Sequence, residues 1–239
     1  MAKTRTSPPR KRMDAAAPAP RTDTAAATPA NPRVVDVRAP LPVPIVFIIA
    51  GVLGWWAAFN LILDKILVLE AQIEGVEADL DCNFSLLVNC GVNLESWQGE
   101  VFGFPNPIIG LAGFVAPIAV GVALLAGARF ARWFWITFAV GVAGALAFCI
   151  WLMSQSFFEL FTLCLWCMLV WSVTIPLFWT LWLFILSRGI IPVPPRAQRF
   201  FAKAFTWVPF ITVVSYVIVA LVGQFALDWV TVLLTTGGL

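Results

Sequence analysis

Long apolar stretches alternate with short charged ones along most of the chain. Five stretches contain no charged side chain, and each is close to the roughly 20 residues that an α-helix needs to cross the hydrocarbon core of a bilayer. They are Ile45–Leu63, Ile108–Ala128, Trp133–Met153, Leu160–Leu186 and Phe205–Leu227. This pattern predicts an all-α integral membrane protein with five transmembrane helices.

The charged residues between these stretches are segregated by sign. Apart from Lys65, every Lys and Arg lies in the first 44 residues or in the links at 129–132 and 188–203. The segment 64–107 instead holds eight acidic residues. Because basic links stay on the cytoplasmic side, we expect a multi-pass protein of the bacterial inner (plasma) membrane, with a cytoplasmic N-terminus. The segment 64–107 and the C-terminus are then extracytoplasmic.

Composition divides the chain into three parts. Residues 1–44 are rich in Ala, Pro, Thr and Arg without apolar periodicity, which is typical of a disordered basic tail. Such a tail is more typical of a topology determinant or a contact with anionic lipid than of nucleic-acid binding. Residues 45–188 form the predicted core. Residues 189–239 hold a cytoplasmic link, the fifth helix and a short outer tail.

The types of residue present narrow the chemistry. With 61% hydrophobic and 12% charged residues, the chain falls outside the soluble class. It has no His, which removes the usual general base and the commonest metal ligand, so we expect no metal site. The apolar stretches also lack the charged residues that mark a transport path. The five cysteines are the main reactive groups left, and they point to sulfur chemistry.

Four of the five cysteines form two pairs in the sequence. Cys164-Leu165-Trp166-Cys167 is a C-x-x-C motif, whose thiols lie about one helical turn apart and can close into a disulfide. It lies near the start of the fourth stretch, where the helix dipole favours a thiolate. Cys82 and Cys90 lie in the outer segment and face the same predicted compartment. Cys149 has no partner in the sequence and is interpreted as a packing residue.

Each pair taken alone has a simpler explanation. The C-x-x-C could consist of two packing residues, and Cys82 and Cys90 could form a structural disulfide. Two pairs on one side of the membrane suggest instead a relay, because thiol–disulfide exchange passes electrons from one pair to the next.

The outer segment also contains a helical pattern. Leu94, Trp97, Val101 and Phe104 recur at helical spacing, which predicts a short amphipathic helix lying over the outer end of the bundle. Asn106 follows, and its side chain is expected to cap the second transmembrane helix, with an amide that could also donate to a carbonyl ligand.

At these positions the chain resembles the vitamin K epoxide reductase family, in its bacterial branch. The resemblance covers approximately residues 45–188 and implies that this part is a four-helix transmembrane bundle, the core of the chain, with the fifth transmembrane helix after it. It rests on the family's loop cysteine pair, its loop serine, the asparagine and glycine that open its second helix, and its membrane C-x-x-C, which match Cys82, Cys90, Ser96, Asn106, Gly110, Cys164 and Cys167.

The resemblance implies a role for each cysteine of the two pairs. Cys167 would meet the ring of a membrane quinone, and Cys164 would exchange with the loop. Cys90 would form the transient disulfide with Cys164, while Cys82 would take electrons from a reduced partner protein.

It also implies three quinone-binding positions. Asn106 would hydrogen-bond a quinone oxygen, and Ser96 would help stabilise the site near the C-x-x-C. Trp171 stands where vertebrate members have a tyrosine that contacts the quinone. The indole ring of Trp171 also carries a hydrogen-bond donor, but its N–H group lies in a different place from a tyrosine hydroxyl.

Many bacterial relatives continue into a fused thioredoxin-like domain, whereas few residues follow Leu227 here. We therefore expect the thiol donor to be a separate extracytoplasmic thioredoxin-fold protein of the DsbA type. The expected reaction turns a partner dithiol and a quinone into a partner disulfide and a quinol. Two alternatives stay open: reduction of a quinone epoxide, and a non-enzymatic multi-pass protein whose loop disulfide is structural.

Overall fold

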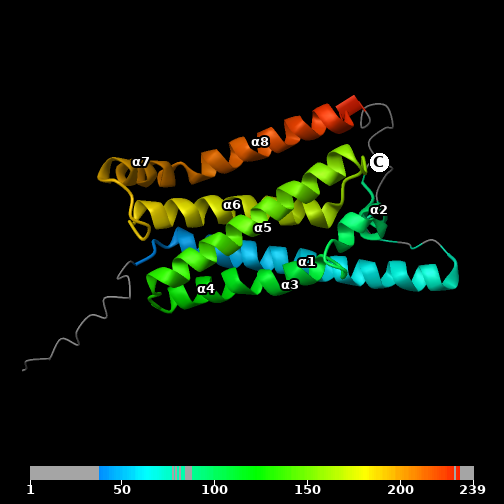
Figure 1. Ribbon diagram of the computed structural model, residues 1–239, viewed down its shortest axis with the longest axis horizontal. Coiled ribbons are helices and arrows are strands. Elements are labelled where there is room, and N and C mark those ends of the chain that lie inside the picture. The colour runs from blue at the N-terminus through cyan, green and yellow to red at the C-terminus, as the bar shows by residue number, and fades with distance from the viewer. Residues whose placement is uncertain are drawn as a thin grey trace, which may run out of the picture. The chain divides into compact units, whose positions relative to one another are not determined.

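The apolar stretches form helices in the computed structural model, which describes residues 38–76, 78, 80, 82–83, 88–228 and 230–231. Most of the predicted tail, residues 1–37, lies outside the described residues. Within the described part, the secondary structure consists of helices and one isolated β-bridge. The elements (Figure 1) are α1 (Pro42–Glu74), α2 (Cys90–Glu95), η1 (Trp97–Glu100), α3 (Pro107–Gly113), α4 (Val115–Leu125), α5 (Arg132–Phe158), α6 (Leu165–Ser187), α7 (Pro195–Thr206) and α8 (Val208–Leu227).

Five of these helical spans are long and apolar enough to cross a membrane: α1, α3 together with α4, α5, α6 and α8. The predicted all-α membrane protein with five spans is therefore confirmed. α6 lies at the centre and packs against α1, α5 and α8, and 56% of its most apolar 18-residue segment is buried. In α8 only 6% of the corresponding segment is buried, and this helix lies on the outside of the bundle against α6 and α5.

Small residues let α1 and α4 pack closely. A Cβ atom at Gly54 would lie 2.4 Å from the ring of Phe114, and one at Gly121 would lie 2.9 Å from the carbonyl oxygen of Pro44. Both distances are shorter than any real contact allows, so these two positions require glycine. The resulting contact holds the first and second spans together.

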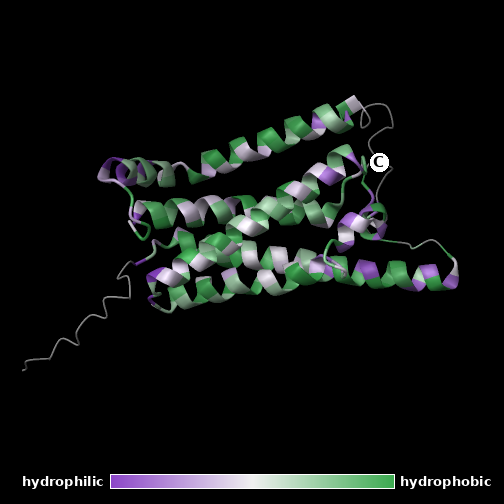
Figure 2. Cartoon of the chain, viewed as in Figure 1, coloured by the Kyte–Doolittle hydropathy of each residue, from purple (hydrophilic) through white to green (hydrophobic). Residues whose placement is uncertain are grey.

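α1 is longer than its apolar stretch. Its 33 residues extend to Glu74, where Gly75 adopts a left-handed conformation and ends the helix. The predicted end at Leu63 is thus too early, because the helix continues through the charged residues that follow. Figures 1 and 2 show this extension, which mixes hydrophilic and hydrophobic residues, reaching past the ends of α5 and α6.

The second span is interrupted at Phe114, between α3 and α4. Pro117 lacks the N–H group that would donate to the carbonyl of Gly113, so the helical ladder breaks there. α7 was not predicted at all. It is an amphipathic helix within the link before α8, and its basic residues are Arg196, Arg199 and Lys203.

A proline inside α6 is compensated by a tyrosine from α8. Pro176 cannot donate to the carbonyl of Ser172, one turn earlier. The hydroxyl of Tyr216 donates to that carbonyl instead. Nearby, the indole N–H of Trp179 donates to Ser215 Oγ over 3.1 Å. These two bonds attach α8 to the bundle.

Candidate active site

The loop cysteines are joined to each other. Cys82 and Cys90 form a disulfide, and neither side chain is exposed. Cys90 opens α2, where Asn89 is the N-cap and its side chain accepts from the Val92 N–H over 3.3 Å. The Cys90 N–H donates to Asn83 Oδ1 over 2.9 Å. The ends of the disulfide loop are therefore fixed by local hydrogen bonds.

A backbone bridge joins this loop to the start of α6. Val88 and Leu163 form a parallel β-bridge, and the Asn89 N–H donates to the Leu163 carbonyl over 2.9 Å. Cys90 and Cys164 follow directly on the two sides of this bridge. The bridge thus brings the loop pair next to the C-x-x-C motif.

α6 begins at Leu165, later than the predicted start at Leu160. Residues 159–164 form the link from α5, with Phe161 at a φ of +52°, instead of the first turn of α6. Glu159 is the C-cap of α5, which extends to Phe158 and not only to Met153.

The two cysteines of the motif occupy different positions at the start of α6. Cys164 is the N-cap, and its sulfur accepts from the Cys167 N–H over 3.4 Å. Both thiols are free. Cys164 is fully buried in one cluster with Cys82 and Cys90, and Cys167 packs against that cluster. The structure therefore gathers the two predicted pairs at one end of the bundle.

Polar side chains tie the loop to the α5–α6 link. Asn93 donates to Thr162 Oγ1 over 3.3 Å and accepts from Ser156 Oγ over 3.0 Å. The Thr162 hydroxyl in turn donates to the carbonyl of Asn89 over 3.0 Å. These residues were not singled out from the sequence, because their partners lie more than sixty positions away along the chain.

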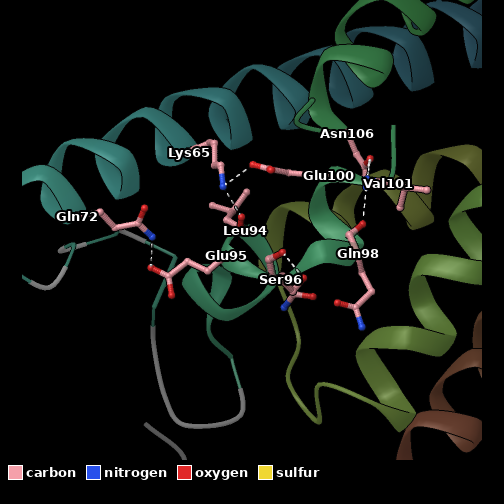
Figure 3. Close-up of polar contacts among 10 residues, drawn as sticks. Lys65, Gln72, Leu94, Glu95, Ser96, Gln98, Glu100, Val101 and Asn106 are labelled. Atoms are coloured by element: carbon pink, nitrogen blue, oxygen red, sulfur yellow. Dashed lines mark hydrogen bonds and ion pairs between the residues drawn. The ribbon is translucent and has the colours of Figure 1, made fainter. Parts of the chain in front are cut away.

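We call α2 and η1 the roof, because together they lie over the cavity described below. A single amphipathic helix was predicted here, but Ser96 adopts an extended conformation and divides it in two. The Ser96 hydroxyl donates to the Asn93 carbonyl over 2.8 Å. From α1, Lys65 donates to the Leu94 carbonyl over 2.7 Å and pairs with Glu100 over 2.8 Å (Figure 3).

Asn106 holds the roof instead of capping α3. Its Nδ2 donates to the carbonyl of Gln98 over 2.6 Å, and its Oδ1 accepts from the Val101 N–H over 3.2 Å (Figure 3). Its own backbone is helical, and its side chain makes no capping bond to α3. The expected cap is thus wrong, because the loop offers its backbone groups closer to the amide.

A cavity of about 640 Å³ lies below the roof, between α1, α3, α4, α5 and α6. This volume is within the usual range for a small-molecule site. Its walls are mainly apolar. The residues singled out from the sequence that border it are Leu94, Ser96, Asn106, Gly110, Cys149, Cys167 and Trp171.

The cysteines differ in their access to the cavity. Cys149 and Cys167 border it, whereas Cys82, Cys90 and Cys164 do not line it. Trp171 is buried and packs edge-to-face on Phe157, with ring centroids 5.8 Å apart. A molecule in this cavity would meet one sulfur of the C-x-x-C, with the others behind it.

A carboxylate lies beside the loop disulfide. Asp64 Oδ2 is 3.3 Å from Cys82 Sγ, and the potential ligand atoms of Asp64, Cys82 and Cys90 lie within 4.8 Å of one another. With both sulfurs joined in a disulfide, this group offers no thiolate to a metal ion.

Comparison with protein families accounts for this arrangement. The profile of the vitamin K epoxide reductase family matches residues 45–182, which is more than half of the chain. The chain belongs to the vitamin K epoxide reductase family. Searches of curated proteins and of solved structures gave no match. Membership of this family makes the protein a membrane oxidoreductase that uses cysteine redox chemistry.

The family match covers nearly all of the four spans that surround the cavity and reaches residue 182 in α6. Two further residues of the site, besides those that tie the loop to the α5–α6 link, were not assigned a role from the sequence. Lys65 stood out only as the one cation outside the basic segments, and Gln98 carried no signal beyond its place in the predicted amphipathic helix.

Proposed function

We propose that this protein is a quinone-linked thiol oxidase that supports disulfide formation. Its thiol donor is an extracytoplasmic thioredoxin-fold protein of the DsbA type, and its acceptor is a quinone dissolved in the membrane. The observation that carries the proposal is the joint burial of Cys82, Cys90 and Cys164 in one cluster, with Cys167 between that cluster and an apolar cavity.

Electrons enter at the loop pair. Two thiols of the partner reduce the Cys82–Cys90 disulfide, which leaves a partner disulfide and two loop thiols. Cys90 then attacks an oxidised Cys164–Cys167 pair at Cys164, and Cys82 resolves the mixed disulfide by attacking Cys90. Two electrons and two protons have then moved inward, and the loop disulfide is restored.

Electrons leave at the cavity. The Cys164–Cys167 dithiol gives two electrons and two protons to the quinone, which leaves a disulfide and a quinol. Protein dithiols of this class have potentials of roughly −120 to −270 mV, so a quinone of higher potential draws electrons away from them. Asn106 and Trp171 border the cavity and would contact the quinone, with Ser96 beside them.

The position of the cavity suits an apolar substrate. A quinone reaches the protein from the lipid, and the cavity lies among membrane-crossing helices with mainly apolar walls. The cysteine end of the bundle carries the acidic segment, which we place on the extracytoplasmic side, where a soluble partner is available.

The test is quinol production by the purified protein with a reduced DsbA-type protein and menadione. We expect turnover by the wild type and at least a hundredfold loss in Cys167→Ala and in Cys164→Ala, because each removes one sulfur of the dithiol. In Cys90→Ala, the partner should remain trapped as a mixed disulfide on Cys82. Wild-type turnover of a quinone epoxide, but not of menadione, would favour epoxide reduction instead.

Full turnover by Cys167→Ala would contradict the proposal. An oxidation state of Cys164 and Cys167 that does not respond to quinone would favour the structural alternative, in which the loop disulfide only stabilises the fold. Trapping no protein on Cys82 would contradict the proposed partner alone.

A further inference from the structure

One buried polar group at the cavity has no hydrogen-bond partner in the fold. Gln98 belongs to η1, is 6% exposed and borders the cavity. Its Oε1 atom is fully buried and makes no hydrogen bond within the described part of the chain. A buried acceptor that is left unpaired is costly, so such a group calls for a partner that the protein does not supply.

The fold fixes the backbone of Gln98 without using its side chain. The Gln98 carbonyl accepts from Asn106 Nδ2 over 2.6 Å, and the same asparagine accepts from the Val101 N–H. In Figure 3 the dashed line from Asn106 ends at this carbonyl, and the side-chain amide of Gln98 extends away from it. The backbone of Gln98 is thus held in place by a bond that a change of its side chain leaves intact.

Gln98 borders the same cavity as the C-x-x-C motif. Gln98 follows Leu94 along the roof, and Leu94 packs in one cluster with Cys90 and Cys164. Cys167, in the first turn of α6, packs against that cluster and borders the same cavity as Gln98.

We propose that the side-chain amide of Gln98 hydrogen-bonds an oxygen of the quinone head group. This inference rests on the proposed function. A primary amide contains both a donor and an acceptor. Its Nε2–H group donates to the carbonyl of the quinone, and a half-turn of the amide about the Cγ–Cδ bond brings Oε1 to the hydroxyl of the quinol. One side chain therefore binds both redox states, whereas Asn106 already gives one N–H to the Gln98 carbonyl and its Oδ1 to the Val101 N–H, and keeps a single N–H for the quinone.

The test is Gln98→Met, which keeps the length of the side chain and removes both polar atoms. The matched control is Gln72→Met, at an exposed position of α1 outside the cavity. Dissociation constants for menadione and for its quinol are measured by quenching of tryptophan fluorescence, together with KM for menadione. The infrared carbonyl stretch of bound menadione reports the hydrogen bond directly.

We expect Gln98→Met to bind both forms about three- to tenfold more weakly, as for the loss of one hydrogen bond, and to shift the carbonyl stretch to higher frequency. Its melting temperature should equal or exceed that of the wild type, because an unpaired buried acceptor is removed. Gln72→Met loses an exposed hydrogen bond to Glu95 of α2, outside the cavity, and should match the wild type in both affinities and in the carbonyl stretch.

Unchanged affinity and an unmoved carbonyl stretch in Gln98→Met would overturn the inference, as would weaker binding that accompanies a lower melting temperature and an unmoved stretch. In either case, turnover of menadione by the wild type would leave the proposed function standing. A wild type that neither binds nor reduces menadione would overturn both.

Discussion

Lys65 is a buried cation close to the membrane, and its environment explains how it is tolerated. Its side chain is 9% exposed, and its ammonium group contacts the Leu94 carbonyl and Glu100. Transfer of a charge out of water is expensive unless it is paired and hydrogen-bonded, and here it is both. Because Leu94 packs beside the loop disulfide, Lys65 links α1 to the part of the roof that covers the sulfurs.

Lys65→Met should loosen the roof. The change leaves the Leu94 carbonyl without its donor, which costs about 1–3 kcal/mol for a buried acceptor. Reduction of the Cys82–Cys90 disulfide by a water-soluble phosphine should then be at least about fivefold faster, because the disulfide is buried and must open to react. Gel-shift assays of alkylated thiols over time would measure this rate.

Glu100→Gln is the matched control for Lys65→Met. The Glu100 side chain is 42% exposed, so loss of the ion pair alone should cost less than about 1 kcal/mol. Equal acceleration in the two variants would mean that the charge pair, and not the bond to Leu94, holds the roof.

Residue types and spacing identified the cysteines, but not the residues that position them. The C-x-x-C motif and the loop pair can be read along the chain, and the structure places them together. The role of Asn106 could not be predicted in the same way. A polar residue before a helix usually caps it, and only the folded loop brings the Gln98 carbonyl and the Val101 N–H to its amide.

At the scale of elements, the junction of α6 and α8 depends on a defect in one helix. Pro176 frees the carbonyl of Ser172, and the hydroxyl of Tyr216, the only tyrosine of the chain, takes the place of the missing N–H. α8 is otherwise little buried. The bond therefore supplies both a partner for the free carbonyl and an anchor for the fifth span.

Tyr216→Phe should destabilise the protein by about 1 kcal/mol, as for the loss of one hydrogen bond between membrane helices. In a Pro176→Ala background the same change should cost close to nothing, because the alanine N–H restores the bond within α6. Thermal unfolding of the four proteins in detergent would complete this double-mutant cycle. Equal costs in both backgrounds would refute the explanation.

The hydrophobic pattern predicted which elements exist better than where they end. Five spans were found because length and apolarity are local properties. The extension of α1 to Glu74 was missed because Asp64 and Lys65 end the uncharged stretch, although six of the eleven residues from 64 to 74 are apolar. α7 was missed because its basic residues were interpreted only as part of a charged link between two spans.

At the scale of the molecule, the two ends of the bundle differ in charge. The cysteine end carries the acidic residues of α1 and the roof, and the opposite end carries the basic residues of α7 and of the α4–α5 link. The sign of these ends is what sets the expected orientation. The cavity could not be foreseen, because it depends on how helices from distant parts of the chain fail to fill the space between them.

Labelling of single cysteines would test the orientation. In a chain whose own five cysteines are changed to serine, Glu74→Cys should react with a membrane-impermeant maleimide in intact cells. Arg196→Cys should react only after the cells are permeabilised. The reverse pattern would place the loop disulfide on the cytoplasmic side, away from an oxidising compartment, and would contradict the proposed partner.

The β-bridge between Val88 and Leu163 has a consequence for how the site tolerates mutation. Its hydrogen bond joins the backbone N–H of Asn89 to the backbone carbonyl of Leu163, so nearly any amino acid at these places can preserve it. Proline at position 89 is the exception, since it has no N–H to give. The spacing of the two cysteine pairs is thus insensitive to most changes in the side chains around it, and a single imino acid is enough to remove that protection.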